Sequence, residues 1–119
     1  MQYAFLCYHR EKEVFAWSKE QEARVMDDLA AVEAKLRTQG RLGPAVRLMP
    51  TSTATTLHKD RDPPLVVDGP FAETKEQLLG FFIIECQDQA HAIETARELA
   101  VANPGGSYEF RPVLLYRAN

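Results

Sequence analysis

The side chains best suited to chemistry lie in one short polar connection, residues 68–76. It carries three carboxylates, of which Asp68 and Glu73 are the catalytic candidates beside the cation of Lys75. Because Pro70 fixes its own φ and pushes the preceding residue toward an extended backbone, the connection should be stiff. A stiff loop could hold a general acid and base, or grip a polar ligand electrostatically. The plainer interpretation is a solvated strand connection whose charges pair with one another.

Further residues are candidates for the walls of a binding site near this loop. His58 ends a strand pattern about ten residues before Asp68, so a hairpin would bring the two together. Arg111 shares a strand face with Glu109, which predicts an ion pair or, alternatively, an anion site. Tyr8 would add an aromatic wall. The predicted ligand contacts are His58, Glu76, Arg111 and Tyr8.

Other catalytic and cofactor-binding patterns are missing from the sequence. His9, His58 and His91 lack the tight spacing of metal ligands, so we expect exposed histidines and no metal site. Cys7 and Cys86 lie in apolar strand patterns, where a free thiol behaves as a small buried hydrophobe. No serine stands in a G-x-S-x-G elbow, and the glycines are too dispersed for a phosphate loop. We therefore expect no cofactor and no nucleophilic catalysis.

Length and charge narrow the class of protein. The 119 residues fit a single domain, 1–119, and the net charge is −3. Basic residues alternate with acidic ones, so direct nucleic-acid binding is not expected. The longest apolar run is far shorter than the roughly 20 residues of a membrane span. Because residues 1–8 resemble a strand and not a secretory signal, we expect a cytoplasmic protein.

The chain is expected to alternate strands and helices. Ser18 is a predicted N-cap, with Gln21 completing a capping box, and Gly40 is the predicted end of that helix. Asp88 should cap a second helix that stops at Asn103. Apolar and β-branched runs predict strands at 2–8, 45–48, 53–58, 65–67, 77–85 and 108–116.

This order of elements predicts an α+β fold, a ferredoxin-like βαββαβ with an inserted β-hairpin. Two helices can cover only one face of the sheet. Tyr3 and Phe5 alternate with Ala4 and Leu6, so both faces of the first strand carry apolar groups. A homodimer that buries the open face explains this pattern economically.

The segment 67–78 reads V-D-G-P-F-A-E-T-K-E-Q-L and resembles the signature of DGPF-domain proteins in the YCII-related family. The resemblance extends through 53–56, Gly80, 84–85 and 108–113. It implies a dimeric α/β barrel of ferredoxin-like subunits, each with a cleft. It also implies a regulatory link to extracytoplasmic-function sigma factors, which are often encoded beside such proteins. The activity of the family is largely unassigned.

Better-studied relatives of this type carry a proposed histidine and aspartate pair, and this chain departs from it. Asp28 falls at the histidine position, and Asn103, before Pro104, falls at the aspartate position. The pair is therefore not transferred to this chain, and any activity would need other groups, such as Asp68 and Glu73.

Three functions follow from these observations. The first is a dimer that binds an unknown small molecule or acts in regulation, with the polar loop framing a cleft. The second is a cofactor-independent enzyme with Asp68 or Glu73 as base and Lys75 or Arg111 stabilising negative charge. The third is a structural dimer with no ligand.

Overall fold

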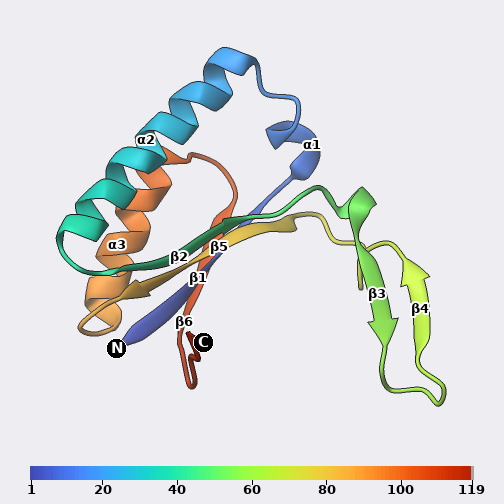
Figure 1. Cartoon of the computed structure of the whole chain (residues 1–119). Helices are drawn as coiled ribbons and strands as arrows, with labels where there is room; N and C mark the ends of the chain where they lie inside the picture. Colours follow the sequence, from blue (N-terminus) through green and yellow to red (C-terminus); the bar gives the residue numbers. More distant parts are fainter. Residues whose placement is uncertain (119) are drawn as a thin grey trace.

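The computed structural model describes residues 1–118 and contains a four-stranded antiparallel sheet with two long helices on one face (Figure 1). Asn119, the last residue of the predicted domain, lies outside the described residues. The strands follow the order β2-β5-β1-β6, and α2 and α3 connect strands that are not neighbours in the sheet. The bounds are β1 Gln2–His9, α2 Lys19–Thr38, β2 Leu42–Arg47, β5 Gln77–Glu85, α3 Gln89–Ala102 and β6 Ser107–Pro112. This topology confirms the predicted α+β, ferredoxin-like fold.

The two helices begin and end where local sequence signals place them. The Ser18 hydroxyl accepts a hydrogen bond from the Gln21 amide at 3.1 Å, and Asp88 accepts one from the His91 amide at 2.8 Å. Gly40, just beyond α2, has a φ of +70°, a conformation that suits glycine. The predicted N-caps at Ser18 and Asp88 are confirmed, whereas the Gln21 side chain makes no return bond to the Ser18 amide within the described residues. The helix positions follow from backbone groups satisfied locally.

The core lies between these helices and the sheet. Phe5 and Ile84 from the sheet meet Leu36 from α2 and Leu99 from α3, and none of the four is measurably exposed. Because β1 and β5 pair in register, with Phe5 opposite Phe82, alternate residues of both strands point to the helices. Burial of each such side chain contributes about 1.5–3 kcal/mol, which holds the helices against this face.

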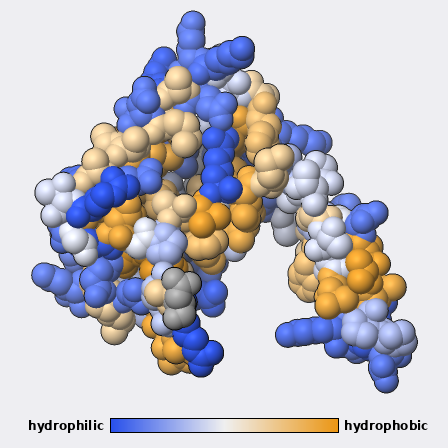
Figure 2. All heavy atoms as spheres, viewed as in Figure 1, coloured by the Kyte–Doolittle hydropathy of each residue, from blue (hydrophilic) through white to orange (hydrophobic). Residues whose placement is uncertain are grey.

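A separate β-hairpin projects from the body (Figures 1 and 2). Its strands are β3, Thr55–His58, and β4, Leu65–Asp68, preceded by the short 3₁₀ helix η1, Thr51–Thr53. The inserted hairpin was predicted, although its first strand begins two residues later because η1 takes up the preceding threonines. Val66, on β4, is 63% exposed, and Phe71, which follows the hairpin in the chain, is 81% exposed.

Three features differ from the expected pattern. The strand β2 spans Leu42–Arg47, where 45–48 was expected. A short helix, α1, Glu11–Val14, follows β1 where we expected only a loop, and its Val14 is buried. The last strand ends at Pro112, before the predicted limit of 116. The Val113 amide still donates to the Gln2 carbonyl at 2.8 Å, and because β1 begins at Gln2 it offers no further partner beyond this bond. None of the helices described in residues 1–118 is long and apolar enough to cross a membrane.

Leu36→Ala should lower the free energy of unfolding by about 2–5 kcal/mol, because it leaves a cavity where α2 meets the sheet. Val101→Ala is the control, since Val101 lies on α3 and is 84% exposed, and it should change stability by less than about 0.5 kcal/mol. Urea unfolding followed by circular dichroism measures both. Equal losses in the two variants would contradict this account of the core.

Candidate functional site

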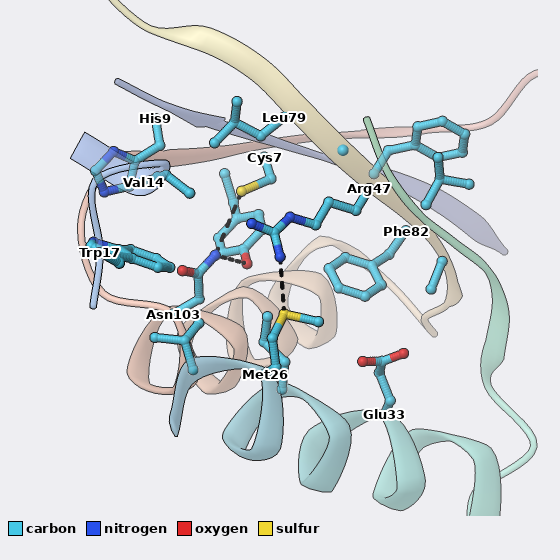
Figure 3. Close-up of a pocket in the computed structure, with 17 residues that line it drawn as sticks. Cys7, His9, Val14, Trp17, Met26, Glu33, Arg47, Leu79, Phe82 and Asn103 are labelled. Carbon is cyan, nitrogen blue, oxygen red and sulfur yellow. Dashed lines mark hydrogen bonds between the residues drawn. The ribbon is translucent and has the colours of Figure 1, made fainter. Parts of the chain in front are cut away.

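A cavity of about 180 Å³ lies between α2 and the sheet, at the end where β1 runs into α1 (Figure 3). Most of its wall is apolar, from residues of α2, β2 and β5. Its lining also includes Cys7, His9, Glu33, Arg47, Asn103 and Tyr108. The sequence did not indicate this cavity, because its wall comes from seven segments that are separate in the chain.

An irregularity in β5 shapes the wall of the cavity. The pairing of β1 with β5 shifts between Cys7 and Tyr8, which leaves Leu79 as an extra residue on β5. Leu79 and Gly80 are consecutive and both buried, which regular alternation would not allow. A Cβ on Gly80 would come within 2.2 Å of the Val46 carbonyl oxygen, so only glycine permits this close approach of β2.

Three polar side chains from three segments meet at one end of the cavity. The Asn103 amide nitrogen donates to the Tyr108 hydroxyl at 3.1 Å and to the Cys7 sulfur at 3.6 Å. Asn103 caps the end of α3, Tyr108 lies on β6 and Cys7 on β1. Figure 3 shows the amide between its two partners. The group is preorganised, because each side chain is held by a different element.

The chemistry of this group is that of neutral hydrogen-bonding atoms. Burial is the main cause that raises the pKa of the Cys7 thiol above its ordinary value. Burial, followed by the nearby Cys7, also raises the pKa of Tyr108 well above its ordinary value. Both groups therefore stay protonated at neutral pH, and Cys7 lacks the thiolate that a nucleophile needs.

Arg47 crosses one side of the cavity and is held there by three contacts. Its guanidinium forms a 2.8 Å ion pair with Glu22 and donates to the Met26 sulfur at 3.5 Å. It also lies 5.9 Å from the centre of the Phe15 ring. Glu22 and Met26 belong to α2, so Arg47 connects β2 to that helix over the cavity (Figure 3).

His9 is buried, which corrects the expectation that it is exposed. It is 7% exposed, its ring packs edge-on against Trp17 with centroids 6.1 Å apart, and its Nδ1 has no hydrogen-bond partner within the described chain. The nearest carboxylate oxygen is that of Glu13, 3.9 Å from Nδ1. The sequence signal was available: His9 continues the two-residue alternation of Tyr3 and Phe5 toward the helices.

The residues predicted to carry chemistry lie elsewhere. Asp68, Glu73 and Lys75 are exposed, and they are not part of the cavity lining. Lys75 instead borders a shallow polar depression of about 620 Å³ between the loop and α1. The other residues there are Arg10, Glu11, Lys12, Glu13, Thr74 and Gln77.

The predicted ligand contacts are likewise dispersed. The His58 ring lies 6.4 Å from that of Phe71, so the hairpin does bring His58 near the polar loop. Glu76 is half-buried, and its carbonyl oxygen accepts a hydrogen bond from the Thr74 hydroxyl. Arg111 forms the expected ion pair with Glu109, with Nε 3.4 Å from the carboxylate. Tyr8, opposite Leu78, is half-buried on the sheet face that points away from the helices.

The two cysteines are free thiols, Cys86 buried and Cys7 half-buried. Within residues 1–118, no cluster of three or more histidine, cysteine or acidic side chains is placed to hold a metal ion.

The fold and the cavity define a ferredoxin-like α+β domain with a pocket on the helix side of its sheet. The sequence model of the YCII-related domain matches residues 1–117, and the chain belongs to that family. An uncharacterised protein of Rhizobium meliloti (strain 1021) is 53% identical over 118 residues, which cover 98% of this chain and 95% of the relative. Asn103 lines the cavity, whereas Asp28 is exposed on α2 and outside the lining.

The raised pKa values of Cys7 and Tyr108 predict a loss of stability in alkali. The contribution of Cys7 to stability is present at neutral pH and falls as the pH rises above about 9, and that of Tyr108 falls above about 10. The reason is that each side chain ionises at a lower pH in the unfolded chain than in the folded one. Each group changes the free energy of unfolding by at most about 1.4 kcal/mol per pH unit. Cys7→Ala and Tyr108→Phe should each flatten this alkaline fall in urea unfolding experiments. Slopes identical to wild type would contradict the assignment.

Proposed function

We propose that this protein binds a small molecule in the cavity between α2 and the sheet. The observation that carries the proposal is an apolar cavity with a preorganised, neutral polar group at one end, Cys7, Asn103 and Tyr108. Such a combination is typical of ligand sites, where apolar walls supply affinity and few polar atoms supply orientation. A volume of about 180 Å³ suits a molecule of one ring, since cavities of about 150 Å³ hold benzene.

Thermal shift measurements with a panel of single-ring molecules test this proposal. A binder at a hundred times its Kd should stabilise the protein by about 2.7 kcal/mol. Val25→Phe enlarges a buried lining residue and should abolish the shift. Its control is Val101→Phe, on the exposed side of α3, which should retain the shift. Shifts that persist in a folded Val25→Phe protein would exclude this cavity as the site.

We further propose that the protein is a homodimer. Ala4, Leu6 and Tyr8 of β1, with Phe81 and Ile83 of β5, form the sheet face turned away from the helices. The hairpin adds exposed apolar side chains, and a two-stranded ribbon is marginally stable without a packing partner. Figure 2 shows apolar residues on the projecting hairpin as well as on the body. A second copy of the chain would cover both surfaces.

Light scattering should give about twice the 13.5 kDa chain mass at micromolar concentration. Leu6→Asp should shift the protein to the monomer, because it places a charge in the proposed interface. Val101→Asp makes the same kind of change on α3 and should leave the dimer intact. A monomeric wild type would contradict the proposal.

In the proposed dimer, the polar loop, residues 68–76, would lie at the second copy of the chain. Covering of the hairpin by a second copy would carry Asp68, Glu73 and Lys75 to the partner's surface, where they would frame a cleft. A regulatory link to an extracytoplasmic-function sigma factor is supported by the resemblance of the loop segment alone. A cytoplasmic setting is supported by the two free thiols. The alternative function is a cofactor-independent enzyme that uses Asp68 or Glu73 in the loop as a base.

A further inference from the structure

Glu33 is a carboxylate that enters an apolar cavity without a partner. It lies on α2, is half-buried, and makes no hydrogen bond or ion pair with any residue in 1–118. Figure 3 shows its carboxylate directed from α2 toward the side of the cavity that holds Phe82. A charge placed against apolar groups is unfavourable unless something pairs with it. We propose that the ligand of this cavity is a protonated amine on an apolar body, and that Glu33 binds the ammonium group.

The positive charge of the cavity is already neutralised. Arg47 is paired with Glu22 at 2.8 Å and is further held by Met26. Glu22 therefore competes with any anionic ligand for the guanidinium, whereas Glu33 has no such protein partner. This asymmetry favours a cationic ligand over an anionic one.

The neutral end of the cavity also offers a free acceptor. The Asn103 amide nitrogen donates to Cys7 and to Tyr108. Its carbonyl oxygen makes no hydrogen bond within the described residues and, in Figure 3, lies on the side of the amide away from Cys7. Both Glu33 and Asn103 thus offer acceptors, and a ligand must bring donors to satisfy them.

The apolar wall suits the body of such a ligand. Trp17 and Phe82 line the cavity, and aromatic faces attract cations as well as apolar rings. With a volume of about 180 Å³ the cavity accepts one ring bearing a short amine. The inference rests on the proposed function, because it names the ligand class of the same cavity.

Three matched probes test the ligand class: benzylamine, benzyl alcohol and benzoate, each at millimolar concentration near pH 7. Isothermal titration of the wild type should give the tightest binding for benzylamine, weaker binding for benzyl alcohol and none for benzoate. Glu33→Gln should weaken benzylamine about tenfold or more, because a charge-assisted hydrogen bond is lost, and should leave benzyl alcohol within about twofold. Asp27→Asn removes the same charge from an exposed position of α2 and should leave benzylamine binding unchanged.

The outcomes separate this inference from the proposed function. If benzyl alcohol or benzoate binds at least as well as benzylamine, and Val25→Phe abolishes that binding, the cavity is a ligand site but the amine preference is wrong. If Glu33→Gln binds benzylamine as the wild type does, Glu33 is not its partner. If none of the probes, nor any of the single-ring panel, binds at millimolar concentration, both proposals fail.

Discussion

The central position of β1 is the constraint on which the rest of the structure depends. It lies between β5 and β6 and is antiparallel to both, so its alternation decides which side chains face the helices. Phe5 enters the core beneath α2 and α3, while Cys7 and His9 continue on the same side into the cavity. Ala4 and Leu6 point the opposite way and form the open face. The pairing and alternation of β1 therefore determine which residues form the core, the cavity and the open face of the sheet.

The cavity forms where this regular packing ends. The extra residue at Leu79 breaks the alternation of β5, and Gly80 lets β2 approach closely. Beyond that point the lining comes from residues at the ends of helices. These are Asn103, the C-cap of α3, and Trp17, which precedes the N-cap of α2. Asn103 lies at such an end, and its side chain meets Cys7 of β1 and Tyr108 of β6, so a neutral polar group adjoins the apolar wall.

Much of the fold was predictable because its signals are local. The Ser18 and Asp88 caps and the Gly40 terminator depend on backbone groups a few residues away, and all three are present as expected. The order of strands and helices then predicted the ferredoxin-like topology. The end of β6 and the existence of α1 were missed, because they depend on where the partner strand β1 begins and on the burial of Val14.

The candidate site was much less predictable, for a physical reason. Charged residues that cluster in sequence, as in 68–76, are those that a loop can keep in water, and the structure leaves Asp68 and Glu73 exposed. The polar groups of the cavity are isolated in sequence: Cys7 and Asn103 are 96 residues apart and meet only through the fold. His9 is an exception, because the two-residue alternation of β1 could have predicted that its side chain faces the helices. Dense charge thus indicates a solvated loop, whereas single polar residues in apolar elements can meet inside a pocket.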